Sequence, residues 1–116
     1  LFFGTGNPSP QMNDLSRPGD NLYTVSLVAL DTETGKLKWH YQQVPHDLWG
    51  YDLASPPVLF NYQHQGKTVP AVGQAGKTGW YYVNDRATGK LLMKSDAFVP
   101  QKNMFAKATK EGTVLY

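Results

Sequence analysis

The stretch "ALDTETGKLKW", Ala29 to Trp39, decides the fold because a second stretch, "VNDRATGKLLM" from Val83 to Met93, repeats its pattern. Each copy has an aspartate, then Thr-Gly three and four residues later, then a large apolar residue eight positions after the aspartate. An aspartate side chain accepts backbone N–H groups in such a turn, and a glycine takes the positive φ that the turn requires. We therefore predict two hairpins of the same kind, after which Trp39 and Met93 pack on a neighbouring strand or sheet.

The segments around both turns have the sequences of short β-strands. Leu37 to Gln42, for example, alternates large apolar with polar residues. The predicted strands are residues 22–30, 37–42, 58–62, 69–72, 79–84 and 91–93, with further strand-like sequence at 1–3 and 113–116. Helical periodicity is weak and predicts at most one helical turn, over Lys102 to Lys110. A repeated turn of this kind is typical of stacked β units such as propeller blades, although two unrelated hairpins can share it.

The composition limits the class of protein. With 116 residues the chain is long enough for one compact domain and too short for two. Hydrophobic residues make up 41% and aromatic residues 13%, against 17% charged, which indicates a folded, turn-rich β protein. The net charge is only +2 and the basic residues are scattered, so we expect no nucleic-acid partner. Because cysteine is absent, disulfides, thiol catalysis and cysteine-ligated metals are excluded in this stretch.

The two ends of the sequence both look like strands, and no signal peptide precedes the first. We therefore expect residues 1–116 to be part of a longer protein, a partial β-propeller domain. A propeller blade buries both faces against its neighbours, so an isolated pair of blades leaves apolar faces and strand edges exposed. The remaining propeller blades are thus expected partners. No apolar run reaches the roughly 18 residues needed to span a bilayer.

The first copy of the repeat resembles the tryptophan-docking motif, Ala-x-Asp-x-x-Thr-Gly-x-x-x-Trp, of the eight-bladed β-propeller quinoproteins. The stretches "GTGNPSP", "RPGDNLYTVSLVALD", "PHDLWGYDLASPPVLF" and "GQAGKTGWYYVNDRATGKL" also stand in the order in which alcohol and glucose dehydrogenases dependent on pyrroloquinoline quinone (PQQ) carry them. The resemblance covers residues 1 to about 92. It implies an all-β fold of about two antiparallel four-stranded blades, with docking motifs at 29–39 and 83–93.

The same resemblance implies a function. Proteins of this family hold PQQ and a calcium ion on the propeller axis and oxidise alcohols or aldose sugars by hydride transfer to the quinone. A small alcohol or sugar would be the substrate here, and a cytochrome or ubiquinone the electron acceptor. The family also implies a periplasmic or other extracytoplasmic location.

Two residues match binding positions of the family. Asn7, in "GTGNP", matches the asparagine whose side-chain oxygen binds calcium, a hard cation that takes neutral amide oxygens. Lys77, in "AGKTG", matches the basic residue that donates hydrogen bonds to the quinone oxygens and stabilises negative charge there. Without the resemblance, Asn7 is a turn residue before a proline and Lys77 a surface lysine. Arg86 lies inside the second docking turn and is predicted to be solvated.

The proposed general base of the family is missing. The family's His-Asp-x-Trp-Asp stretch ends in an aspartate that takes the alcohol proton, and Gly50 stands at that position. Asp52, which matches an acidic position of the glucose-dehydrogenase-like branch, is therefore our candidate proton acceptor. A structural carboxylate is the alternative for Asp52. His46 and Asp47 are predicted to stabilise the turn before it.

Three functions remain open at this level. Gly50 favours a propeller that kept the fold as a binding or assembly scaffold, whereas Asn7 and Lys77 favour a dehydrogenase. A carbohydrate-binding β domain that uses Trp49, Trp80 and the tyrosines is the third possibility, although blade packing explains those aromatics better. We expect the isolated chain to bind PQQ weakly, because the family places its axial carboxylate ligand and its ring-stacking residues in other blades.

Overall fold

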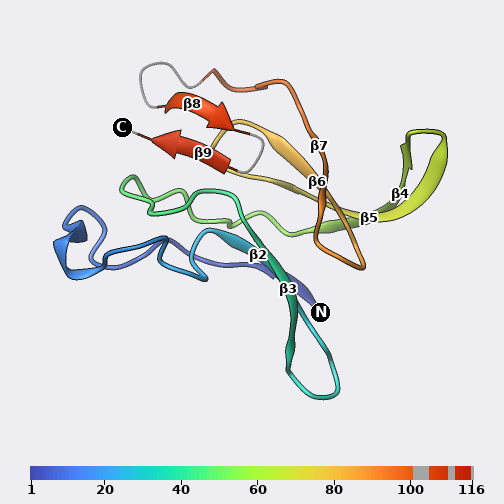
Figure 1. The fold of residues 1–116 in the computed structure, drawn as a ribbon, viewed down its shortest axis with the longest axis horizontal. Helices are drawn as coiled ribbons and strands as arrows, with labels where there is room; N and C mark the ends of the chain where they lie inside the picture. The colour runs from blue at the N-terminus through green and yellow to red at the C-terminus, as the bar shows by residue number, and fades with distance from the viewer. Residues whose placement is uncertain (101–104, 110–111, 116) are drawn as a thin grey trace.

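Two antiparallel sheets follow each other along the chain in this computed structural model (Figure 1). The structure describes residues 1–100, 105–109 and 112–115, with side chains described as far as residue 100. The first sheet has the order β1 (Phe2–Gly4), β2 (Ser26–Leu30), β3 (Leu37–Gln42). The second has the order β4 (Val58–His64), β5 (Lys67–Ala75), β6 (Tyr81–Asp85), β7 (Leu91–Lys94), and a hairpin of β8 (Phe105–Thr109) and β9 (Gly112–Leu115) follows.

This architecture confirms the predicted all-β fold of antiparallel blades, with three strands of the first blade and four of the second. The predicted strand 37–42 matches β3, whereas the strand predicted over 22–30 begins only at Ser26. Asn21 and Val25 have positive φ angles, 57° and 47°, which interrupt extended backbone just before it. Among the described residues, the helical content is one 3₁₀ turn at Asp14–Ser16, and no helix is long and apolar enough to cross a membrane.

The helical turn predicted over residues 102–110 is wrong where the structure describes that segment. Residues 105–109 form strand β8, which pairs with β9 in an antiparallel ladder. The helical pattern of this segment is weak, and its pairing with β9, which follows within a few residues, determines its conformation instead. Strand formation depends on such partners more than on intrinsic propensity.

Both docking turns close as predicted. Gly35 and Gly89 take φ angles of 69° and 76°. The Oδ1 atom of Asp31 accepts the backbone N–H groups of Glu33 and Thr34 at 3.0 and 2.9 Å, and that of Asp85 accepts those of Ala87 and Thr88 at 2.8 and 3.1 Å. Each aspartate therefore satisfies two N–H groups that the turn leaves without backbone partners.

Trp39 connects the first sheet to the docking turn of the second. Its indole Nε1 donates to the carbonyl oxygen of Arg86 at 3.0 Å, and only 8% of the residue is exposed. A Cβ atom on Gly89 would lie 2.6 Å from the indole Cε3, so a glycine is required where the ring lies on the backbone. The predicted docking of Trp39 on a neighbouring sheet is confirmed. Met93 lies on β7 opposite Val83, and its docking stays a prediction.

Arg86 is half-buried and bonds to its own sheet, whereas the sequence predicted a solvated side chain. Its guanidinium donates to the carbonyl oxygens of Ala71 and Phe60, with distances of 3.1 to 3.3 Å. These bonds carry the side chain across β5 toward β4, so it ties the docking turn to its own sheet. Its main-chain oxygen meanwhile receives the Trp39 indole. The planar fork of an arginine suits several carbonyl acceptors at once.

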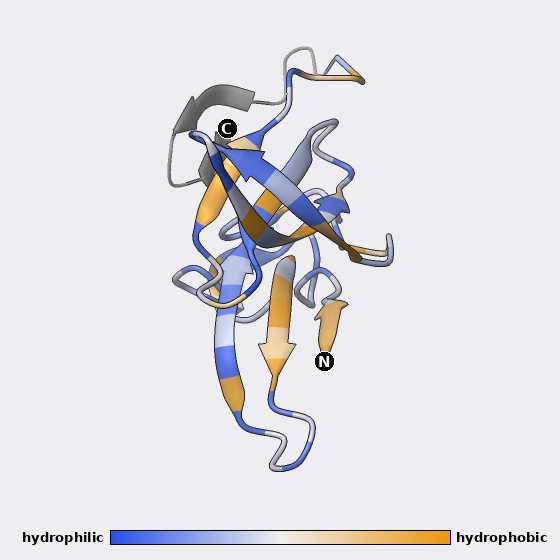
Figure 2. Ribbon diagram, turned by 90° about the vertical axis from the view of Figure 1, so that its right-hand side faces the viewer, coloured by the Kyte–Doolittle hydropathy of each residue, from blue (hydrophilic) through white to orange (hydrophobic). Residues whose placement is uncertain are grey.

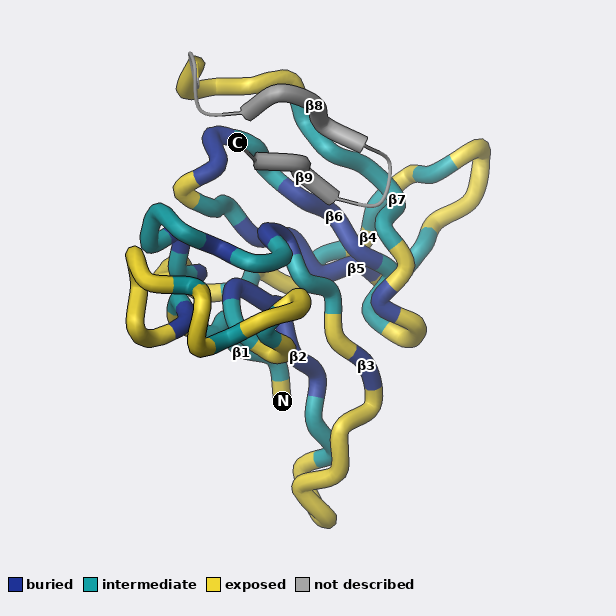
Figure 3. Tube along the Cα trace, turned by 60° about the vertical axis from the view of Figure 1, so that its left-hand side comes forward, coloured by how far each residue is buried: buried dark blue, intermediate teal, exposed yellow. Residues whose placement is uncertain are grey.

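The apolar residues form two clusters. The first lies between the sheets and combines residues of β2, β3 and β5: Leu27, Ala29, Trp39 and Val72, with Phe2 and Tyr41 at its edge. Figure 2 shows hydrophobic residues on β1 next to the N-terminus, and Figure 3 shows buried residues on β2, β5 and β6. The second cluster lies in the loops and consists of Val25, Val44, Tyr51 and Leu53, with Trp49 against it. The loops therefore have a core of their own, which fixes their side chains in place.

Candidate functional site

The three predicted site residues lie on three loops at one end of the sheets. Asn7 follows β1, Asp52 lies between β3 and β4, and Lys77 follows β5. In antiparallel sheets the loops after alternate strands share an end. The first two loops extend to the left in Figure 1, and the backbone N–H of Leu53 donates to the Thr5 oxygen at 3.0 Å to join them.

Lys77 and Asp52 form an ion pair across two loops. The Nζ atom of Lys77 donates to Oδ1 of Asp52 in a short hydrogen bond and to the carbonyl oxygen of Gly50 at 3.0 Å. The Lys77 side chain is 56% exposed and that of Asp52 is 31% exposed. The structure thus brings together the predicted quinone ligand, the candidate proton acceptor and the backbone of the position where the family has its base.

Asp47 holds the turn that carries Gly50. Its carboxylate is fully buried and accepts the backbone N–H groups of Trp49, Gly50 and Tyr51 at 2.9, 3.1 and 2.8 Å. The φ angle of Gly50 is 81°, which favours glycine at this position. Burial, together with the Asp47 charge, raises the pKa of Tyr51. Asp47 therefore stabilises the turn, as predicted.

His46 contacts a different loop from the one expected. Its Nδ1 lies 2.5 Å from the Gly19 oxygen and its Nε2 lies 2.9 Å from Oδ2 of Asp14. The hydrogen bond with Asp14 raises the pKa of His46, and the same bond lowers the pKa of Asp14. Since both ring nitrogens face acceptors, the imidazolium form satisfies both contacts. His46 thus clamps the β1–β2 loop to the β3–β4 loop and does not stabilise its own turn.

Asn7 is half-buried, and its Nδ2 donates to the Pro8 oxygen at 3.2 Å. Its contact is with its own neighbour and not with the Lys77–Asp52 pair. Among the described residues its Oδ1 accepts no hydrogen bond, so this hard oxygen ligand is available to a cation. The same residues contain no group of three or more His, Cys, Asp or Glu side chains that could hold a metal ion. The donor chemistry therefore fits a hard cation, but this chain supplies only part of a coordination shell.

Arg17 organises the long β1–β2 loop, and the sequence reasoning gave it no role. Its Nη1 donates to Oδ1 of Asn21 at 2.5 Å. Its Nη2 donates to the main-chain carbonyl oxygens of Gln11 and Asp47 at 2.6 and 2.9 Å. Its signal in the sequence was the stretch "RPGDN", which we noted as part of the resemblance.

Gln43 is a second residue that the sequence reasoning missed. It is fully buried, and its side-chain amide atoms have no hydrogen-bond partner within the described part of the chain. A Cβ atom on Gly76 would lie 2.6 Å from Oε1 of Gln43, so the Lys77 loop passes close over this buried amide. The available sequence signal was the glycine that directly precedes Lys77.

The tryptophans proposed for carbohydrate binding are engaged in packing. Trp49 lies against the loop cluster. The Nζ atom of Lys94 lies 3.6 Å from the ring centroid of Trp80, and burial lowers the pKa of Lys94. A cation over an indole face is a stabilising contact. These contacts favour the packing interpretation of both rings.

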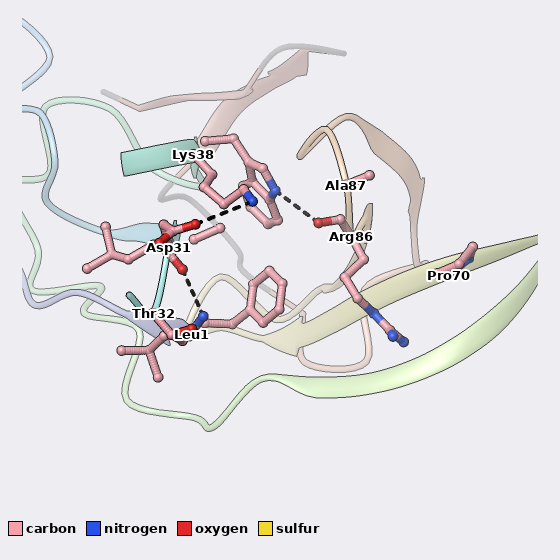
Figure 4. Close-up of a pocket in the computed structure, with 11 residues that line it drawn as sticks. Leu1, Asp31, Thr32, Lys38, Pro70, Arg86 and Ala87 are labelled. Atoms are coloured by element: carbon pink, nitrogen blue, oxygen red, sulfur yellow. Dashed lines mark hydrogen bonds and ion pairs between the residues drawn. The ribbon is translucent and has the colours of Figure 1, made fainter. Parts of the chain in front are cut away.

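A cavity of about 440 Å³ lies at the opposite end, beside the docking contact. Lys38 of β3 lines it, together with Asp31 of the first docking turn and Arg86 of the second (Figure 4). It contains neither Lys77 nor Asp52, and the Trp39–Arg86 hydrogen bond runs beside it. We assign it to the junction between the two blades and not to the candidate site.

Comparisons with known proteins place this geometry in a family. A sequence profile described as "PQQ: Glucose/ethanol/alcohol dehydrogenase, beta-propeller domain" matches residues 1–111. Quinoprotein alcohol dehydrogenase PedH of Pseudomonas putida is 41% identical over 116 residues, which are all of this chain and 19% of the relative. Lanthanide-dependent methanol dehydrogenase of Methylorubrum extorquens is 36% identical over 107 residues, 92% of this chain and 18% of that protein. The chain thus spans less than a fifth of these relatives.

Solved structures agree with the sequence comparison. The quinohemoprotein alcohol dehydrogenase ADHIIG of Pseudomonas putida superposes with a TM-score of 0.90 and 36% identity, covering 100% of this chain and 17% of that one. A europium-containing methanol dehydrogenase superposes with a TM-score of 0.89 and 30% identity, covering 99% of this chain and 20% of that one. The chain therefore belongs to the PQQ-dependent glucose, ethanol and alcohol dehydrogenase family and forms part of its β-propeller domain.

Proposed function

We propose that this chain is part of a quinoprotein oxidoreductase that oxidises an alcohol or aldose by hydride transfer to PQQ with the help of a bound cation. The Lys77–Asp52 ion pair carries the proposal, because it joins a cation and a proton acceptor on loops at the end that also holds Asn7. When bound, PQQ would supply the hydride acceptor. Only family membership supports the substrate class.

Lys77 would hold a quinone oxygen. Its ammonium is fixed between the Asp52 carboxylate and the Gly50 carbonyl, so its position does not depend on a flexible stem alone. A positioned cation stabilises the negative charge that a quinone oxygen acquires as it is reduced.

Asp52 would accept the substrate's hydroxyl proton. As the C–H bond breaks and its electron pair leaves with the hydride, the O–H proton needs an acceptor, and the Asp52 carboxylate is the acidic group held at Lys77. Gly50 has no side chain to serve. The carbonyl product forms when both the hydride and the proton have left.

The cation would be held by hard oxygen ligands, with Oδ1 of Asn7 as one of them. Calcium is our proposal from the family resemblance. A lanthanide is the second candidate, because two similar proteins are named lanthanide-dependent and europium-containing. A trivalent ion favours additional carboxylate ligands, and for such an ion Asp52 is a candidate ligand instead of a proton acceptor.

The location and the electron acceptor are also part of the proposal. We place the full protein in the periplasm or another extracytoplasmic compartment, with a cytochrome or ubiquinone as electron acceptor. One relative, from Thauera butanivorans, is named 1-butanol dehydrogenase (cytochrome c) and is 41% identical over 95 residues, 80% of this chain and 14% of that protein. Another, from Xanthomonas campestris pv. juglandis, is named probable quinate dehydrogenase (quinone) and is 44% identical over 94 residues, 79% of this chain and 12% of that protein, so the two names support one acceptor each.

A non-catalytic propeller scaffold of the same repeat family is the second candidate function, and Gly50 is the observation that favours it. The experiment uses the full-length protein loaded with PQQ and either calcium or lanthanum, with alcohol-dependent reduction of an artificial electron acceptor as the readout. We expect turnover that needs both PQQ and a metal, and its loss in Lys77→Ala but not in Lys36→Ala, an exposed lysine of the first docking turn. PQQ binding without turnover under either metal supports the scaffold.

A further inference from the structure

The space that a side chain at position 50 would use is taken by Gln11. A Cβ atom built on Gly50 would lie 2.7 Å from Nε2, 3.3 Å from Cδ and 3.6 Å from Oε1 of Gln11. The carboxamide thus lies directly over the Cα atom of Gly50. The Nζ atom of Lys77 also contacts position 50, because it donates to the carbonyl oxygen of Gly50 at 3.0 Å. Position 50 is therefore contacted by two polar side chains from two other loops.

This placement of Gln11 is held by long-range contacts. The Nη2 atom of Arg17 donates both to the main-chain carbonyl oxygen of Gln11 at 2.6 Å and to that of Asp47 at 2.9 Å. Asp47 in turn accepts the backbone N–H of Gly50. One guanidinium and one carboxylate thus connect the backbone of residue 11 to that of residue 50.

The Gln11 carboxamide has unused hydrogen-bonding capacity. Within the described part of the chain its side chain makes no hydrogen bond, and the residue is exposed. A carboxamide offers one acceptor oxygen and two N–H donors, the complement of an alcohol hydroxyl. An amide does not take up a proton near neutral pH, so it can hold a hydroxyl group without acting as a base.

We propose that Gln11 is a substrate-contacting residue, whose carboxamide hydrogen-bonds the substrate hydroxyl beside Gly50 and determines which alcohols are held next to the Lys77–Asp52 pair. This inference rests on the proposed dehydrogenase function. In the family a carboxylate stands at the position of Gly50, and here two residues would share its roles. Gln11 holds the hydroxyl group, and Asp52 takes its proton.

The test measures kcat and KM for a small primary alcohol in the full-length protein loaded with PQQ and its metal. Gln11→Ala is expected to lower kcat/KM about three- to tenfold, the effect of one neutral hydrogen bond, mainly through a higher KM. Gln63→Ala is the matched control, since Gln63 lies on β4 and bonds Thr68. PQQ loading, followed by absorbance, should be the same in all three proteins. A Gln11→Ala protein with the kinetics of the Gln63→Ala control would overturn the inference.

A second variant tests the contact itself. The end of a glutamine side chain moves easily, so the methyl group of Gly50→Ala should displace the carboxamide and lower kcat/KM at least as far as Gln11→Ala does, because the positive φ of 81° adds a backbone strain that does not depend on Gln11. The double variant Gln11→Ala/Gly50→Ala should then lose no more in kcat/KM than the worse single variant, because both changes remove the same contact. Fully additive losses would contradict the contact. Absence of PQQ-dependent turnover in the unmodified protein would overturn the proposed function and this inference with it.

Discussion

The two ends of the sheets are held by different kinds of contact. At the docking end, Asp31 and Asp85 bond to N–H groups two and three residues away, and the repeat is visible in the sequence. At the loop end, Lys77 bonds across 25 residues to Asp52, and Arg17 bonds across 30 to Asp47. Local contacts build the frame of each blade, and long-range contacts between loops build the candidate site. A change at the first end should therefore alter stability, and a change at the second, where Asp47 also holds the fold of a loop, should alter chemistry as well as stability.

Trp39→Ala is expected to have the largest effect on stability. The substitution removes a ring from the cluster between the sheets and the hydrogen bond to the Arg86 carbonyl. Truncation of a buried tryptophan costs about 3–5 kcal/mol. The measurement is denaturant unfolding of the full-length protein, with Leu37→Ala, at an exposed position of the same strand, as control. Equal losses for the two variants would show that the docking contact does not support the fold.

Asp47→Ala should come next, at about 3 kcal/mol, because it leaves three backbone N–H groups of a largely buried turn without their acceptor, a fully buried carboxylate. Asp31→Ala removes the same kind of acceptor from an exposed turn, where water replaces it, so its loss should be smaller. Urea unfolding of both variants of the full-length protein gives the comparison. A larger loss for Asp31→Ala would contradict the view that the loop end depends on buried polar contacts.

The smallest expected effect is a pH-dependent one at the His46–Asp14 contact. The hydrogen bond to Asp14 raises the pKa of His46 above its usual value of about 6.5, so the clamp contributes fully below about pH 6.5 as long as Asp14 stays ionised. Its contribution is lost as the pH rises through the higher pKa of the folded state. An NMR titration should show the His46 pKa falling toward 6.5 in Asp14→Asn. An unchanged pKa in that variant would rule out the ion pair as its cause.

The sequence predicted best the local structure that depends on residues close together along the chain. Asp31 and Gly35 could be assigned because their partners lie within the same turn. The placement of Gln11 over Gly50, and the bonds of Arg86 to the sheet, could not be predicted, because they depend on residues that only the fold brings close. The helical turn expected over 102–110 failed for the same reason, since β9 decides the conformation of β8.

The candidate site was predicted from the family resemblance and not from local sequence patterns. Lys77, Asp52 and Asn7 were named from the family resemblance, and the structure joins the first two in an ion pair. No pattern in the sequence indicated that they would meet, because the loops that carry them are folded by Asp47, Arg17 and the cluster around Tyr51.

The central claim is that the Lys77–Asp52 pair carries the chemistry although position 50 has no carboxylate. Its most direct test is kcat for alcohol oxidation by Asp52→Asn in the full-length protein loaded with PQQ and metal, with Asp20→Asn as the control on a neighbouring loop. Loss of a proton acceptor lowers turnover about 10²- to 10⁴-fold. In the calcium-loaded protein we predict a loss of this size with PQQ and metal content unchanged, since Asn7 remains as a calcium ligand and the Gly50 carbonyl still accepts a hydrogen bond from Lys77. A kcat equal to that of Asp20→Asn would contradict the account.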